Sequence, residues 1–257
     1  MGSEMCIRDR RKRVLFNRGY RIFGRTDHYI MFTGRLSDKV KYKTIVKHKE
    51  KNHEQIIVDG EVYIEHRFLK KTIKIEDGKL IILPPDAPIE DGAEVYNAAG
   101  KKVVPGFIDV HTHGAVGVDV NAATAEDYEK ICRFAAGNGT TSWLCSVLTD
   151  TKEQTEWCID EYKKHQKMEH KGANLLGIHL EGPFLSSEYK GAMPEHLLQK
   201  ANMPLLKEYQ DRAEGNIRYI TISPEVEGLI DDIPAMKELG ITVAIGHSGA
   251  DYDTSWK

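Results

Sequence analysis

The sequence contains no run of apolar residues long enough to cross a membrane, since a spanning helix needs about 20 of them. Its basic start also lacks the apolar stretch that would follow in a secretory signal. We therefore expect a cytoplasmic protein with no membrane partner. With 257 residues and 40% hydrophobic content, the chain can bury the core of one large domain, or of a large domain and a small one.

Cysteine is scarce, and none of it occurs with the CxxC spacing of a zinc ribbon. The four cysteines are Cys6, Cys132, Cys145 and Cys158. Three of them fall inside apolar helix or strand patterns, where small buried thiols are common. The pattern favours structural thiols and does not indicate a disulfide framework.

Acidic residues are few at the start of the chain, where residues 1–54 carry 15 Lys or Arg against 6 Asp or Glu. Such a basic arm could bind nucleic acid, and salt-sensitive binding to DNA would support that reading. The segment shows no sustained period and no recognisable motif, however. We favour a disordered or non-native extension over residues 1–54, and we expect no nucleic-acid partner.

A small β domain of the sandwich type is predicted over residues 55–104. Its apolar residues alternate with polar ones, which is typical of strands with one buried face. The dipeptides Asp59-Gly60 and Asp77-Gly78 are typical of tight turns between antiparallel strands.

Residues 105–257 show a different rhythm, in which apolar runs alternate with amphipathic helical stretches, as in a parallel α/β sheet. The strands are expected at 106–110, 141–147, 175–180, 218–222 and 242–245. Thr124 and Thr151 are predicted to begin helices. Because no Gly-rich dinucleotide fingerprint follows the first strand, we predict a partial TIM-type (β/α) barrel with about five of its eight strands.

Two histidines, His111 and His113, lie at the carboxyl end of the first of these strands, in the segment PGFIDVHTHG. Side chains two residues apart on a strand point to the same face, so both imidazoles are expected at the barrel mouth. That arrangement suits two nitrogen ligands of one divalent metal ion. The carboxyl ends of barrel strands are also where enzymes of this fold place functional groups.

Two further strand ends supply a carboxylate and an imidazole. Glu181 ends the third strand and would be costly to bury without a cation, so we expect a metal ligand. His247 follows the fifth strand, and His179 lies deeper, where a supporting hydrogen-bonded role is expected. The remaining histidines, including His165 and His170, lie in charged surroundings and are expected to be ordinary solvated residues.

With these residues the sequence resembles the N-acetylglucosamine-6-phosphate deacetylases of the amidohydrolase superfamily. The resemblance runs from about residue 56 to residue 252 and rests on five segments in the family's order: PGFIDVHTHG, HLEGPFL, KGAMPEHL, TISPE and AIGHSGADYD. It implies Glu181 and His247 as ligands of a main divalent ion, expected to be zinc. It also implies a second ion at His111 and His113 in members that keep this pair.

The resemblance further implies that Ala192 and Met193 contact an amino-sugar phosphate substrate, mainly through the backbone. The family's general acid and base is an aspartate in a later segment that these 257 residues do not contain. We therefore expect the chain as given to be inactive, and the complete protein to be a homodimer.

Two other readings remain open. Amidohydrolases that act on cyclic amides usually bridge two ions with a modified lysine on the fourth strand, and here that strand reads RYITISPE, without lysine. The second alternative is a catalytically dead remnant that holds no metal ion, which a measurement of metal content would reveal.

Overall fold

The computed structural model describes residues 22–25, 29–32, 55–76 and 79–256. The chain divides into two compact units, one formed by residues 1–107 with 136–141 and the other by residues 108–135 with 142–257. None of the helices in these described ranges is long and apolar enough to cross a membrane.

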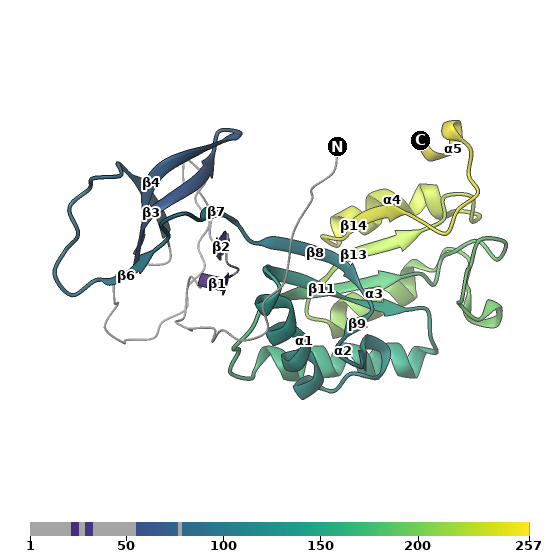
Figure 1. Cartoon of the computed structure of the whole chain (residues 1–257). Helices are drawn as coiled ribbons and strands as arrows, with labels where there is room; N and C mark the ends of the chain where they lie inside the picture. Colours follow the sequence, from purple (N-terminus) through teal and green to yellow (C-terminus); the bar gives the residue numbers. More distant parts are fainter. Residues whose placement is uncertain (1–21, 26–28, 33–54, 77–78, 257) are drawn as a thin grey trace. The chain divides into compact units, whose positions relative to one another are not determined.

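The first unit contains one seven-stranded sheet (Figure 1). Its strands are β1 (Ile22–Arg25), β2 (Tyr29–Phe32), β3 (Gln55–Ile64), β4 (Arg67–Glu76), β5 (Lys79–Leu83), β6 (Glu94–Asn97) and β7 (Lys102–Pro105). The order is β1-β2-β7-β3-β4-β5, and β6 pairs with β3. A sandwich-type domain over 55–104 stays a prediction. The expectation for residues 1–54 falls mostly outside the described residues, although β1 and β2 lie within that segment.

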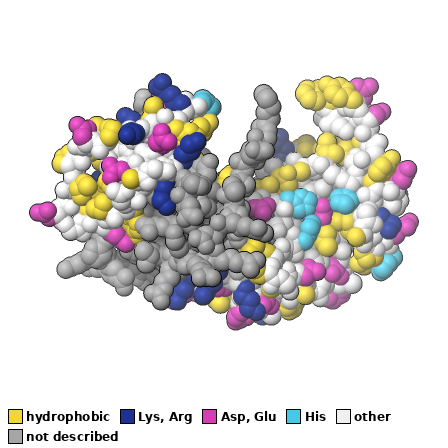
Figure 2. Space-filling view, in the orientation of Figure 1, with side chains coloured by type: hydrophobic (Ala, Val, Ile, Leu, Met, Phe, Trp, Pro, Cys, Tyr) yellow, Lys and Arg dark blue, Asp and Glu magenta, His cyan; other side chains and the backbone are white. Residues whose placement is uncertain are grey.

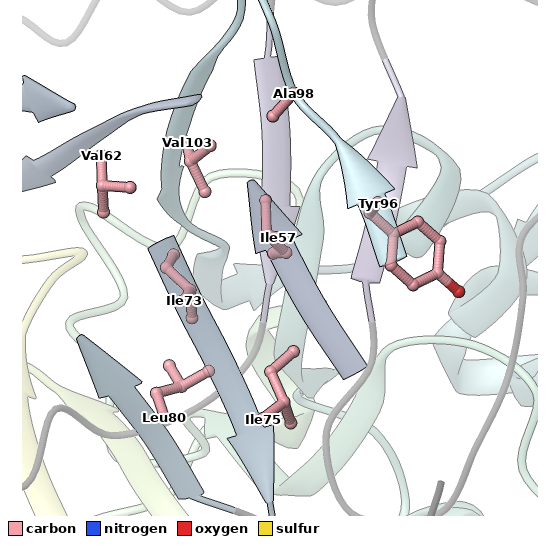
Figure 3. Packing of buried hydrophobic residues seen from close by; sticks show 8 residues of the cluster. All are labelled: Ile57, Val62, Ile73, Ile75, Leu80, Tyr96, Ala98 and Val103. Atoms are coloured by element: carbon pink, nitrogen blue, oxygen red, sulfur yellow. The ribbon is translucent and has the colours of Figure 1, made fainter. Parts of the chain in front are cut away.

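Alternation along β3 and β4 places one face of this sheet in a buried apolar cluster (Figure 3). The cluster consists of Ile57, Val62, Ile73, Ile75, Leu80, Tyr96, Ala98 and Val103. These residues come from five strands and the turn after β6, so the cluster joins the separate hairpins into one unit.

The prediction of a turn at Asp59-Gly60 is wrong. Both residues lie inside β3, where the pairing with β4 is irregular and Asp59 has a φ of 62°. The chain reverses instead at Glu65 and His66, both with positive φ. A Cβ at Gly60 would lie 2.7 Å from Val103 Cγ2, so the glycine allows close packing in mid-strand. The second predicted turn, Asp77-Gly78, lies outside the described residues.

The second unit is built around a five-stranded sheet of order β14-β13-β12-β11-β8. The strands are β8 (Phe107–Thr112), β11 (Thr140–Leu148), β12 (Asn174–Glu181), β13 (Ile217–Ile222) and β14 (Thr242–Ile245). Strands β11 to β14 pair in parallel. All five lie within two residues of their predicted positions, and the partial TIM-type barrel is confirmed.

Helices follow the strands along the chain, as a βαβ arrangement requires (Figure 1). They are α1 (Ala125–Gly137), α2 (Lys152–Gln166), α3 (Met203–Arg212), α4 (Leu229–Glu238) and the short α5 (Tyr252–Trp256). Small elements complete the unit: the pair β9 (Gly114–Ala115) and β10 (Val118–Asp119), and the 3-10 turns η1 (Val120–Ala122) and η2 (Glu195–Leu197).

Both predicted helix starts are confirmed. The backbone N–H of Gln154 donates to the Thr151 hydroxyl at 3.2 Å, which caps α2. At α1, the backbone N–H of Asp127 donates to the Thr124 hydroxyl at 3.3 Å, and the Asp127 carboxylate accepts from the Thr124 backbone N–H at 3.2 Å. These caps fix where the chain leaves the loops at the carboxyl ends of β8 and β11.

Candidate active site

The predicted ligands come from strands that are not neighbours in the sheet. His111 and His113 lie at the end of β8, and β11 separates β8 from β12, which ends at Glu181. His247 follows β14, which is separated from β12 by β13. Neighbouring strands lie about 4.8 Å apart, so only a curled sheet lets both edges approach its central strand.

The structure brings all four side chains together. Nε2 of His111 and Nε2 of His247 lie 3.2 and 3.1 Å from Oε1 of Glu181, and Nε2 of His113 lies 3.0 Å from Oε2. The Nε2 atoms of His111 and His113 are 3.1 Å apart. Figure 2 shows histidine side chains gathered beside an acidic side chain on the visible face.

Burial and neighbouring charges shift the pKa of the Glu181 carboxyl in opposite directions. Glu181 has only 5% of its side chain exposed. Burial raises the pKa of the Glu181 carboxyl, but the hydrogen bond from His113 and the charges of His113 and His111 outweigh burial and bring the pKa to about 2. The hydrogen bond to Glu181 is also the main cause that raises the pKa of His113 above 6.5. The carboxylate is therefore ionised and faces the three rings.

Backbone carbonyls hold two of these rings by their other nitrogen. Nδ1 of His113 lies 3.0 Å from the carbonyl oxygen of Ser146, and Nδ1 of His247 lies 2.9 Å from that of Tyr189. Since a carbonyl only accepts, each Nδ1 carries the proton and donates it. In the neutral ring, Nε2 then presents its lone pair toward Glu181, which is the form that binds a metal ion.

The donor set suits a divalent ion on chemical grounds. Zinc binds nitrogen at about 2.0–2.1 Å with tetrahedral geometry, which places neighbouring ligand atoms roughly 3.3 Å apart. Four separations between these donor atoms, three of them to Glu181 and one between His111 and His113, are 3.0 to 3.2 Å and close to that value. His111, His113 and Glu181 therefore form a group that could hold an ion. His247 lies beside this group, 3.1 Å from Oε1 of Glu181.

His179 faces the same side of β12 as Glu181 but lies deeper and is fully buried. Its Nδ1 lies 2.8 Å from the Ser146 hydroxyl and its Nε2 lies 2.9 Å from the Thr221 hydroxyl. Burial, and next the charge of neighbouring His111, lower the pKa of His179 to about 4, so the ring is neutral near pH 7. Its ring centroid is 4.7 Å from that of His111 in an edge-on arrangement, so the His179 ring packs against the His111 ring.

A cavity of about 400 Å³ opens beside the four donors. Its lining combines three of them with residues of two loops: His113, Glu181, His247, Leu148, Thr149, Ala192, Met193 and Pro194. The structure thus brings Ala192 and Met193, predicted to contact a substrate, to the same cavity as the predicted ligands. Met193 is 4% exposed, and its backbone carbonyl accepts a hydrogen bond from Lys190 Nζ at 3.2 Å.

Sequence reasoning missed two supporting residues. Thr149 lines the cavity and donates through its hydroxyl to the Glu181 carbonyl at 2.8 Å. Glu225 accepts from the Ser248 hydroxyl at 2.6 Å and from the Gly249 backbone N–H at 2.8 Å, which holds the loop after His247. A signal for both was present, since each closely follows the carboxyl end of a predicted strand.

Comparison with curated proteins identifies relatives over most of the chain, although no protein-family model matches it. N-acetylglucosamine-6-phosphate deacetylase from Bacillus subtilis (strain 168) is 31% identical over 201 residues, covering 76% of this chain and 51% of the relative. N-acetylgalactosamine-6-phosphate deacetylase from Escherichia coli O157:H7 is 27% identical over 180 residues, covering 70% and 46%. The chain spans about half the length of the curated relatives it matches.

Comparison with solved structures also identifies a deacetylase of the same name. N-acetylglucosamine-6-phosphate deacetylase from Pasteurella multocida matches with a TM-score of 0.71 at 27% identity, covering 79% of this chain and 53% of that one. A D-hydantoinase matches with a TM-score of 0.50 at 24% identity, covering 75% and 39%. The second likeness shows the barrel-type fold alone.

Proposed function

We propose that this chain, which belongs to the N-acetylglucosamine-6-phosphate deacetylase family of amidohydrolases, forms the first five barrel strands of an enzyme that hydrolyses the acetamide of N-acetylglucosamine 6-phosphate. The products are glucosamine 6-phosphate and acetate. The observation that carries the proposal is the convergence of three imidazoles on the buried carboxylate of Glu181 beside an open cavity.

A divalent ion, with zinc as the expected one, supplies Lewis-acid chemistry that favours attack of water on an acetamide carbonyl. Glu181 would provide the negative charge that balances such an ion, while His111, His113 and His247 would offer their Nε2 atoms as ligands. Oε1 faces His111 and His247, and Oε2 faces His113, so both oxygens of Glu181 would be available to hold a metal ion. The carbonyls of Ser146 and Tyr189 hold two rings in the binding tautomer.

The cavity supplies the substrate's place beside these donors. Ala192 and Met193 contact the sugar phosphate through their backbone, on a loop that Lys190 ties to the Met193 carbonyl. Met193 and Leu148 give the lining an apolar part that limits the access of water to the reacting carbonyl. The similarity to an N-acetylgalactosamine-6-phosphate deacetylase makes the 4-epimer the second substrate to test.

The 257 residues alone are proposed to be inactive, because the family resemblance assigns the general acid and base to an aspartate beyond the matched segments. Loss of such a group costs on the order of 10²–10⁴ in rate. The complete protein is proposed to be a cytoplasmic homodimer.

Acetate release tests both parts of the proposal. The zinc-loaded protein expressed from the whole gene should release acetate from N-acetylglucosamine 6-phosphate, and the Glu181→Gln variant should not. Hydrolysis of a hydantoin in place of the acetamide would overturn the proposed reaction and favour the cyclic-amide alternative. Acetate release by the 257-residue chain alone would overturn the proposed inactivity.

The absence of stoichiometric zinc from a folded protein would instead favour the metal-free remnant. Comparing kcat/KM for the gluco and galacto substrates decides which amino sugar is preferred.

A further inference from the structure

A second group of histidine, cysteine and glutamate side chains lies on α1, on α2 and in the loop after α2. Glu129 and Cys132 lie on α1, His165 lies in the last turn of α2, and His170 follows that helix. The expectation that His165 is solvated is wrong, because its side chain is 1% exposed. His170 is 30% exposed, so the group is reached from solvent on one side.

The donor atoms of this group converge on one carboxylate oxygen. Nε2 of His165 lies 3.7 Å from Oε2 of Glu129, and Nδ1 of His170 lies 4.0 Å from the same oxygen. The donor atoms of these three residues lie within 4.8 Å of one another. Sγ of Cys132 lies 3.8 Å from Nε2 of His165 and accepts a hydrogen bond from Trp143 Nε1 at 3.3 Å.

The two oxygens of Glu129 have different surroundings. Oε1 accepts hydrogen bonds from Arg133 Nε at 3.1 Å and from the Lys171 backbone N–H at 2.9 Å. Oε2 is buried and has no hydrogen-bond partner among the described residues, although only 9% of the Glu129 side chain is exposed. Leaving a buried carboxylate oxygen without a partner is costly, and this one points at the two imidazoles.

The distances distinguish a bound cation from simple ion pairs. A hydrogen bond between imidazolium and carboxylate has a length of about 2.7–2.9 Å. The observed 3.7 and 4.0 Å are too long for that. They exceed the roughly 3.3 Å between ligands of a tetrahedral zinc ion by about 0.4 and 0.7 Å, which side-chain rotations can supply.

We propose that Glu129, His165 and His170 bind one zinc-class divalent ion, and that the Cys132 thiolate, whose Sγ lies 3.8 Å from Nε2 of His165 but outside this 4.8 Å group, moves in as the fourth ligand when the ion binds. Two imidazoles, a thiolate and a carboxylate form a closed donor set of the kind used by structural zinc sites. Nothing in this set leaves a position for a substrate, so the ion would have a structural role.

The place of the site in the fold supports that role. The loop after α2 docks on α1, where the Ala173 backbone N–H donates to the Cys132 carbonyl at 2.8 Å and a Cβ at Gly172 would meet the Cys132 backbone at 2.2 Å. This loop leads into β12 at Asn174, the opposite end of the strand from Glu181. An ion here would link α1 to the loop that precedes β12. This loop lies at the amino-terminal ends of the strands, the face of a barrel whose residues contribute to stability rather than catalysis.

Cobalt and zinc titrations test the site in the full 257-residue chain. In a Glu181→Gln/His247→Gln background, which removes ligands of the candidate active site, we expect one equivalent of Co²⁺ with tetrahedral visible absorption and a sulfur-to-cobalt charge-transfer band. Adding His170→Gln should weaken binding by more than the roughly 10–100-fold that loss of an outer-shell partner causes. His170 is the most exposed of the three acidic or imidazole ligands, so this variant disturbs packing least.

His66→Asn is the matched control, since it removes an exposed imidazole in the other unit and keeps a residue that tolerates positive φ. Zn²⁺ should raise the melting temperature of the control in the same background but not that of the His170→Gln variant, because only a ligand that binds the folded state stabilises it. Equal Co²⁺ binding with and without His170→Gln, or no binding in the background variant, overturns the proposal. Tetrahedral binding without the charge-transfer band removes Cys132 from the ligand set.

Discussion

Nε2 of His247 lies 3.1 Å from Oε1 of Glu181, although the two residues follow strands that are not neighbours in the sheet. His113, at the end of β8, likewise contacts Glu181, although β11 lies between β8 and β12. One buried carboxylate therefore ties both edges of the curled sheet to its centre. The candidate metal centre and the curvature of the barrel depend on each other.

The Glu181→Gln substitution should empty this centre, because the neutral amide cannot balance the charge of an ion held by three imidazoles. We expect the zinc content to fall by one or two equivalents per chain, measured by plasma emission after dialysis. Glu227→Gln is the control, since that carboxylate is 80% exposed and pairs with Lys200. Unchanged zinc content in Glu181→Gln would show that the four side chains do not form the metal centre.

Replacing Ser146 by alanine should destabilise the second unit. Its hydroxyl meets Nδ1 of His179 at 2.8 Å and accepts the Thr112 backbone N–H at 3.0 Å, so the variant leaves two polar groups unpaired. The expected loss is about 1–3 kcal/mol of unfolding free energy, measured by urea denaturation. Ser142→Ala, on the same strand and half-buried, should change it by less than about 0.5 kcal/mol. Equal effects of the two variants would contradict this role for Ser146.

Gly60→Ala should destabilise the first unit, because the added Cβ would lie 2.7 Å from Val103 Cγ2 and 3.0 Å from Ala98 Cβ. Overpacking of this kind costs about 1–3 kcal/mol. Gly137→Ala, at the end of α1, meets nothing within 4 Å and should be neutral or slightly stabilising. Differential scanning calorimetry of both variants makes the comparison, and a Gly60→Ala melting temperature equal to that of the parent would show that the sheet relaxes freely.

Glu225 should make the loop after His247 sensitive to acid. Burial raises the pKa of Glu225, but hydrogen bonds from Ser248 and Gly249 outweigh it and hold the pKa below 4.5. A carboxyl whose pKa is depressed by folding adds stability above pH 4.5 and loses that contribution as the pH falls below this value. The Glu225→Gln variant should therefore be less stable than the parent at pH 7, and the difference should shrink below pH 4.5.

Thermal unfolding of Glu225→Gln and its parent from pH 7 to pH 3 provides the measurement. The Glu238→Gln variant is the control, because Glu238 is exposed at the end of α4. A difference between Glu225→Gln and the parent that stays constant across this range would show that the charge of Glu225 has no part in holding the loop.

The sequence by itself determined the local features of this protein. Short apolar runs between amphipathic helical stretches placed five strands within two residues of their observed positions, and Thr124 and Thr151 marked two helix starts. His111 and His113 shared a face because strand geometry requires it. Such features depend on interactions between residues only a few positions apart, so a single segment contains enough information to predict them.

Only the tertiary structure decided which distant groups meet. The charged neighbours of His165 suggested a solvated ring, yet the packing of α1 against α2 buries it beside Glu129. Asp59-Gly60 has the composition of a turn, but close packing against Val103 keeps it inside a strand. Likewise, the curl of the sheet sets the distance between His247 and Glu181. Each outcome depends on contacts between segments far apart in the chain, whose free energies no local pattern contains.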